Sequence, residues 1–127
     1  MIEGEPALVR TRSDLPSAED CALFRNLVVA TWTYPASDAN GFPPADMLDR
    51  MDTFETALFT ACERDRWWGC DVAVITRAGQ REWRFYTPDT RAFMAEFNTA
   101  LDGQNPFPIN LTVYDDPDWQ ALRELQA

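Results

Sequence analysis

The sequence contains no histidine and no lysine. Because histidine is the commonest general base and metal ligand, its absence excludes a Ser-His-Asp triad, a Cys-His pair and any histidine-based zinc site. The cysteines, Cys21, Cys62 and Cys70, are too few for an all-cysteine zinc site and include no C-x-x-C pair. An enzyme of this sequence would therefore have to work without histidine.

Long apolar runs and Gly-rich phosphate loops are also missing. No stretch approaches the ~20 apolar residues of a membrane-spanning helix, and no charged-then-apolar leader opens the chain. Scattered cysteines are typical of an intracellular domain with reduced thiols. We therefore predict a cytoplasmic protein without membrane contact, and the missing phosphate loop argues against a nucleotide site.

The size and charge of the chain suit a single acidic domain. Its 127 residues are 46% hydrophobic and include five Trp and eight Phe, which is enough to bury a core, so we expect one domain over residues 1–127. The formal charge is -10. A field of this sign repels nucleic acid and anionic membranes and attracts a basic protein.

The stretch from Thr76 to Asp89 predicts the centre of the fold. Gly79 lies between two strand-like runs, and glycine accepts the positive φ that hairpin turns require. After it, Trp83 and Phe85 alternate with charged and phenolic residues. We therefore expect a hairpin whose second strand has one apolar face and one polar face.

Hydrophobic periodicity predicts the remaining elements. The expected strands span residues 6–12, 23–34, 67–76, 81–86 and 107–114. The expected helices span residues 44–62 and 89–102, with a short helix after residue 118. Thr87 is the expected N-cap of the second helix, and residues 13–20 read as a polar connection.

The order of these elements indicates an α+β fold. From residue 23 it is strand, helix, strand, strand, helix, strand, which is the split βαβ order of a ferredoxin-like sandwich. We expect an antiparallel sheet with both long helices on one face, an extra N-terminal strand and a short C-terminal helix.

The order of several landmarks resembles a known family. They are a helix carrying Leu48, Phe54, Glu55 and Leu58, the G-x-R-E-W-x-F-Y-T hairpin from Gly79, a P-F-P-I strand at Pro106 and the D-P-D-W end at Asp116. Over residues 23–125 the chain resembles the bacterial family catalogued as domain of unknown function 695. The amino-terminal region departs from that family's pattern, and the resemblance implies no activity and no catalytic residues.

The polar face of the hairpin strand is the candidate binding site. It carries Glu82, Arg84 and Tyr86, and neighbouring strands could extend it with Asn110 and Tyr114. Arg and Tyr are over-represented at binding hot spots, but a solvated face with an internal Arg–Glu pair fits the pattern equally well.

Trp67 and Trp68 form an adjacent pair for which we expect one buried and one partly exposed ring. An exposed tryptophan is a frequent interface anchor, so Trp68 joins the candidate binding residues.

Asp115, Asp116 and Asp118 form a dense carboxylate run. Such a run could bind Mg²⁺ or Ca²⁺, but acids before a helix are more often caps, so we predict no metal and no cofactor. A reactive Cys62 beside Arg64 is less expected than a Cys62 buried on the apolar helix stripe.

These features favour a small, non-catalytic module that binds a basic protein. Its most concrete form is an inhibitor or immunity-type partner of a cationic enzyme, such as a nuclease or ribonuclease. The alternative is a histidine-free enzyme or a small-ligand protein that uses Glu82, Arg84, Tyr86 and the carboxylate run. The sequence leaves a homodimer open.

Overall fold

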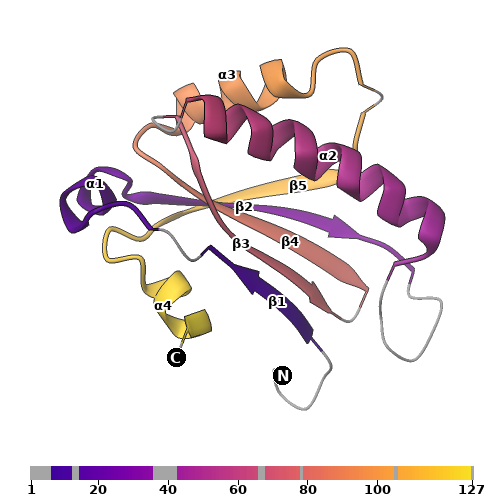
Figure 1. The fold of residues 1–127 in the computed structure, drawn as a ribbon, viewed down its shortest axis with the longest axis horizontal. Helices are drawn as coiled ribbons and strands as arrows, with labels where there is room; N and C mark the ends of the chain where they lie inside the picture. Colours follow the sequence, from indigo (N-terminus) through magenta and orange to yellow (C-terminus); the bar gives the residue numbers. More distant parts are fainter. Residues whose placement is uncertain are drawn as a thin grey trace.

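The computed structural model describes residues 7–12, 15–35, 43–65, 68–77, 79–104 and 106–126. Within these ranges the chain is α+β and forms five strands and four helices (Figure 1). In chain order they are β1 (Ala7–Thr11), α1 (Ala18–Leu23), β2 (Asn26–Thr33), α2 (Ala45–Arg64), β3 (Cys70–Arg77), β4 (Gln80–Thr87), α3 (Thr90–Ala100), β5 (Ile109–Asp115) and α4 (Gln120–Gln126).

All five strands form one antiparallel sheet in the order β1-β3-β4-β2-β5. Trp83 of β4 pairs with Ala30 of β2 and Val74 of β3, and Ala30 pairs in turn with Leu111 of β5. Because side chains alternate between the two faces of a sheet, this register places the large apolar residues of β4 on one face. We call the face that carries Trp83 the inner face and the opposite one the outer face.

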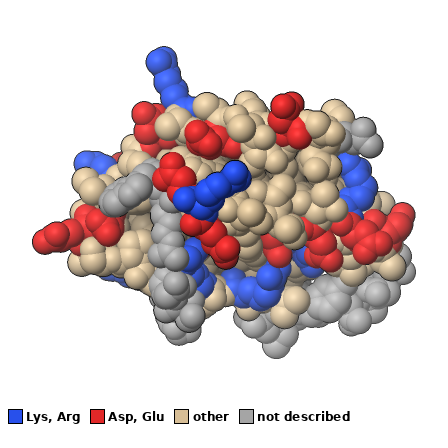
Figure 2. All heavy atoms as spheres, turned by 45° about the horizontal axis from the view of Figure 1, so that its top comes forward, with Lys and Arg blue, Asp and Glu red and all other residues tan. Residues whose placement is uncertain are grey.

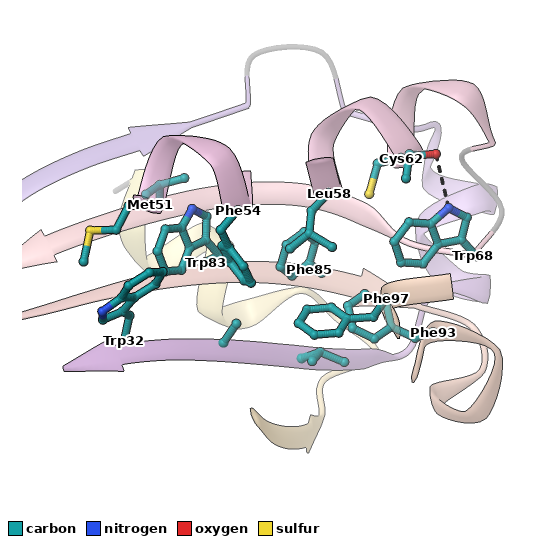
Figure 3. Packing of buried hydrophobic residues seen from close by; sticks show 14 of the residues in the cluster. Trp32, Met51, Phe54, Leu58, Cys62, Trp68, Trp83, Phe85, Phe93 and Phe97 are labelled. Atoms are coloured by element: carbon teal, nitrogen blue, oxygen red, sulfur yellow. Dashed lines mark hydrogen bonds between the residues drawn. The ribbon is translucent and has the colours of Figure 1, made fainter. Parts of the chain in front are cut away.

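Helices α2 and α3 both lie over the inner face (Figure 1). Figure 3 shows the core between them and the sheet, where the ring of Phe54 lies 4.7 Å from that of Trp83 and 6.0 Å from that of Phe97. The prediction that these helices pack on the same side of the sheet is confirmed. Their core residues are Met51, Phe54, Leu58, Phe93 and Phe97, which pack with Trp83, Phe85, Ile109 and Leu111.

Glu55 connects α2 to two strands beneath it. Its Oε1 accepts a hydrogen bond from Trp83 Nε1 at 2.9 Å. The same oxygen forms an ion pair with Arg10 Nη2 of β1 at 2.7 Å. The buried indole N–H of Trp83 therefore has a partner, as buried polar groups require.

The predicted hairpin is present between β3 and β4. Gly79 has φ = 82°, and its carbonyl accepts a hydrogen bond from Tyr34 N at 2.8 Å. A Cβ at this position would lie 3.0 Å from the Tyr34 carbonyl oxygen. Glycine is therefore required here by both the backbone conformation and the close approach of Tyr34, the residue that follows β2.

Two local predictions were wrong. The N-cap of α3 is Asp89, whose carboxylate accepts from Arg91 N and Ala92 N, whereas the Thr87 hydroxyl donates to the Trp68 carbonyl at 2.7 Å. The helix α1, which is capped by Ser17 and lacks buried residues, includes residues 18–20 of the predicted polar connection and Leu23, the first residue of the predicted strand 23–34. The strand β2 begins only at Asn26. Without a buried stripe, α1 has no apolar periodicity to detect.

The outer face is covered in part by α4, which lies on the side of the sheet opposite α2 and α3 (Figure 1). Trp119 and Leu122 pack there against Leu27, Val29 and Tyr86. The sheet thus has an apolar layer on both faces, and the layer on the outer face is the smaller one.

On the helix-covered side, Asp and Glu side chains are dispersed among uncharged atoms, with Arg side chains between them (Figure 2). No single acidic patch dominates this view. Of the described helices, none combines the length and the apolar composition needed to cross a membrane.

Replacing Trp83 tests the assignment of the two faces. Its side chain is completely buried, so Trp83→Ala should cost about 3–5 kcal/mol in the free energy of unfolding. Tyr114→Ala, at a side chain that is 52% exposed, should change it by less than about 0.5 kcal/mol. Urea unfolding of both variants provides the measurement, and a Trp83→Ala protein of unchanged stability would show that the faces are reversed.

Candidate functional site

The predicted polar strip lies on the outer face, but its two parts are not neighbours. Strand β2 runs between β4 and β5, so Thr31 lies between Glu82 and Asn110. In the same way Leu27 lies between Tyr86 and Tyr114. The predicted residues therefore share a face, with a row of β2 side chains separating them.

Tyr86 is not the exposed anchor that the sequence suggested. Its side chain is completely buried, because the indole of Trp119 stacks on it with ring centroids 4.1 Å apart and planes 5° apart. The Tyr86 hydroxyl donates to Asp116 Oδ2 at 2.6 Å. Burial, and then this bond, raise the pKa of Tyr86, so the phenol remains a hydrogen-bond donor.

The Asp116 side chain caps the N-terminus of α4, which begins at Gln120, as the capping interpretation of the aspartate run predicts. Its carboxylate accepts from Gln120 N at 2.9 Å and from Ala121 N at 3.1 Å. Partial burial opposes its ionisation, but the Tyr86 hydroxyl and the two backbone N–H groups outweigh burial and hold its pKa below the ordinary value. Within the described ranges, no three His, Cys, Asp or Glu side chains are grouped as metal ligands.

Trp119 fixes α4 to the rest of the domain. Its indole Nε1 donates to the carbonyls of Phe24 at 2.9 Å and Cys21 at 3.1 Å. Its backbone has φ = 56°, which costs on the order of 1–3 kcal/mol for a residue with a side chain. The stacked ring and the two hydrogen bonds hold the residue in this conformation.

Trp68 is likewise a structural residue and not an exposed anchor. It is buried against Phe93, with ring centroids 5.2 Å apart, and its Nε1 donates to the Ala61 carbonyl at 3.3 Å (Figure 3). The Trp68 side chain, which the sequence analysis placed among the candidate binding residues, is therefore bonded to the C-terminal end of α2. The prediction for its neighbour Trp67 lies outside the described residues.

Between α4 and the outer face lies an open groove of about 390 Å³. Leu27 and Val29 of β2 contribute apolar lining, and an exposed Tyr114 of β5 contributes an aromatic ring. The other lining residues are Glu82, Arg84, Asp115, Asp116, Gln120, Ala121 and Glu124. The groove thus combines several carboxylates with one arginine.

The arginine in this groove is already paired. Arg84 Nη2 lies 3.1 Å from Glu82 Oε2, and Glu82 Oε1 accepts from Gln80 Nε2 at 2.9 Å. This is the internal Arg–Glu pair that the sequence left open as an alternative. The buried Arg84 Nε lacks a hydrogen-bond partner among the described residues. With Arg84 neutralised by Glu82, the remaining lining carboxylates give the groove a net negative charge.

Cys62 is buried on the α2 stripe, as predicted. Burial first, and then the nearby Asp71 and Cys70, raise the pKa of its thiol, which keeps it protonated and unreactive. This geometry does not support a catalytic cysteine at this position.

The sequence did not identify the contribution of α4 to the site. Gln120 and Glu124 lie on a helix that the spacing of Trp119, Leu122 and Leu125 predicts, but nothing in that spacing says which sheet face receives it. The stacking of Trp119 on Tyr86 determines which face of the sheet α4 covers. Two residues so far apart in the chain leave no local sequence pattern that would reveal their contact.

Comparison with known proteins gives one match. A family model matches residues 1–125, a longer span than the expected residues 23–125, and its description is "family of unknown function (DUF695)". No curated protein and no solved structure matches the chain.

Acid titration tests the role of Asp116. A carboxyl whose folded pKa is lowered adds stability above its unfolded pKa of about 3.9 and loses it as pH falls through the folded pKa. Asp116→Asn keeps a capping oxygen but no charge, so it should be less stable than the original chain by up to about 1 kcal/mol at pH 7. The difference should shrink as the pH falls through the folded pKa and the Asp116 carboxylate takes up a proton.

Urea unfolding at several pH values measures this effect, with Asp118→Asn, an exposed neighbour, as the control of equal charge change. A constant gap between the Asp116→Asn protein and the original chain from pH 7 to 2 would contradict the assigned role of the Asp116 charge.

Proposed function

Because the chain belongs to the DUF695 family, whose description states no activity, we propose a function from the geometry of the groove. The protein is a non-catalytic module that binds a basic protein, with an arginine or lysine of the partner entering the groove between α4 and the outer face. One observation carries this proposal: Asp115, Asp116 and Glu124 line the groove together, and the single arginine there is already paired.

The lining supports a peptide-like ligand better than a simple ion. Leu27 and Val29 offer apolar contact for the methylene stem of a long basic side chain, and the carboxylates lie where its charged end would be. Tyr114 is the exposed aromatic residue of the groove and takes the anchoring role first expected of Tyr86.

The net charge of the chain supports the same type of partner. A charge of -10 raises the association rate with a cationic protein. The contacts that the groove residues make with the partner then set the dissociation rate. These charge and groove properties fit an inhibitor or immunity-type protein that binds a cationic enzyme in the cytoplasm, such as a nuclease.

A small anionic ligand is the second candidate, because the buried Arg84 Nε lacks a partner among the described residues. A carboxylate or phosphate could pair with the Arg84 guanidinium, which lines the groove. This candidate predicts that Arg84→Ala abolishes binding, whereas a basic protein should bind an Arg84→Ala chain at least as well.

For the architecture, we propose the ferredoxin-like split βαβ arrangement. The strand order β3-β4-β2-β5, the antiparallel pairing and the position of α2 and α3 on one face support this assignment. In it, β1 extends the sheet beyond β3, and α4 is an addition on the face that the two long helices leave open.

The groove is tested by substitutions that keep the fold. A partner captured from the native host should dissociate faster from the Tyr114→Ala chain, at a cost of about 1–3 kcal/mol in binding. Glu124→Arg should slow association, because it reverses a charge at the groove, whereas Glu96→Arg on the exposed surface of α3 makes the same change on the other side of the sheet.

Both rate constants can be measured by surface plasmon resonance at low and physiological salt. A partner that binds the Tyr114→Ala and Glu124→Arg chains as it binds the original chain does not use the groove. Equal losses for Glu124→Arg and Glu96→Arg would mean that net charge alone drives the association.

A further inference from the structure

Strand β5 is an edge strand with an uncharged, exposed border. It is the last strand in the order β1-β3-β4-β2-β5, and its sequence I-N-L-T-V-Y carries no charge before Asp115. Edge strands usually carry charged residues that prevent pairing with other chains, as Arg10 does in β1 at the opposite edge. Val113 of β5 is 49% exposed, and it lies on the inner-face side.

Alternation of the ladder determines which backbone groups face this open edge. Asp116 N donates to the Arg25 carbonyl at 2.8 Å, and in an antiparallel pair every second residue bonds to the neighbouring strand. Thr112 and Tyr114 therefore bond inward to β2. The N–H and C=O groups of Leu111 and Val113 point outward, where another strand can pair with them.

An apolar hollow of about 210 Å³ lies beside the same edge. It is lined in part by Phe97, Leu101, Phe107, Ile109 and Leu111. Leu111 belongs both to this hollow and to the outward-facing backbone positions, so a strand that pairs with β5 places a side chain at the mouth of the hollow.

We propose that two copies of this chain associate through β5, antiparallel and centred on Thr112. In this register Leu111 of each copy pairs with Val113 of the other, so both sets of outward groups bond. Each exposed Val113 then lies against Leu111 at the mouth of the other copy's hollow. The contact is the same from both sides, as a two-fold interface requires.

The neighbouring registers are worse. A centre at Leu111 pairs Val113 with Ile109, whose N–H already donates to the Phe107 carbonyl at 2.8 Å. A centre at Val113 places Asp115 against Leu111, which brings a carboxylate to an apolar hollow. The register centred on Thr112 pairs Leu111 with Val113 twice, so the four central outward positions all bond, and it confines these costs to the pair of Ile109 with Asp115 at each end of the strand.

Charges at the two ends of β5 also fit a second copy. Arg50 Nη2 donates to the Pro106 carbonyl at 3.1 Å, just before β5, and Asp116 and Asp118 follow the strand. Antiparallel pairing places the end of β5 that carries the aspartates in one copy beside the end near Arg50 in the other. The opposite charges at these ends offset part of the repulsion between two chains of charge -10, which is screened beyond about 8 Å at physiological ionic strength.

The register is tested by a disulfide. Thr112 would face Thr112 of the second copy in a non-hydrogen-bonded pair, with Cα atoms about 4.5 Å apart, within the range of a disulfide. Thr112→Cys should therefore give a covalent dimer under mild oxidation. Asn110→Cys, on the same face of β5, is the control: its Cα atoms would lie about 14 Å apart and should not cross-link. Equal cross-linking at both positions, or none at Thr112→Cys, would overturn the proposed register.

The association itself is tested by sedimentation equilibrium of the non-oxidised chain at physiological salt, from about 1 µM to 1 mM. Val113→Asp should raise the dimer dissociation constant at least tenfold. Leu8→Asp adds the same charge at a side chain that is 50% exposed on the opposite edge strand, and it should leave the constant within about twofold. A chain that is monomeric throughout this range, or that responds equally to both variants, would disprove pairing through β5.

Discussion

The stacking of Trp119 on Tyr86 is the interaction on which the outer half of the structure depends. Helices α2 and α3 cover the inner face, so Leu27, Val29 and Tyr86 of the outer face need another cover. The helix α4 has only seven residues and would not form alone in water. Its position is set by the stacked rings, by the Asp116 cap that the Tyr86 hydroxyl shares, and by the indole bonds of Trp119.

This arrangement also makes the groove. Because Trp119 holds α4 over one part of the sheet, the neighbouring strip of β2 and β5 remains open, and the carboxylates of Asp116 and Glu124 line it. The buried Tyr86 thus contributes to the site indirectly, because it fixes α4 in place, whereas the exposed Tyr114 is accessible to a ligand. The proposed association through β5 would place two such grooves on the same side of a continuous sheet, because a two-fold axis perpendicular to the sheet keeps the two outer faces together.

Periodic patterns predicted most of the fold, since burial on one face of a long element repeats along the sequence. The strand with Trp83 and Phe85 and the stripe of α2 are examples. Sequence patterns did not predict the burial of side chains that a single tertiary contact covers. Tyr86 and Trp68 are residue types that often anchor binding surfaces, but Trp119 stacks on Tyr86 and Phe93 packs against Trp68. The candidate strip contained Glu82, Arg84 and Tyr114, but the helix that completes the groove could not be positioned, because seven residues carry too little periodicity.

Hydrogen exchange at the Trp119 indole tests the central claim most directly, because this N–H is bonded to the Phe24 and Cys21 carbonyls only when α4 is docked. Proton–nitrogen NMR spectra recorded after transfer to deuterated water would resolve the five tryptophan indoles. Docking predicts that the Trp119 indole exchanges as slowly as backbone amides of the central strands. Complete exchange within the first spectrum, with the sheet amides still protected, would show that α4 does not cover the outer face and that the groove is not a stable feature of the protein.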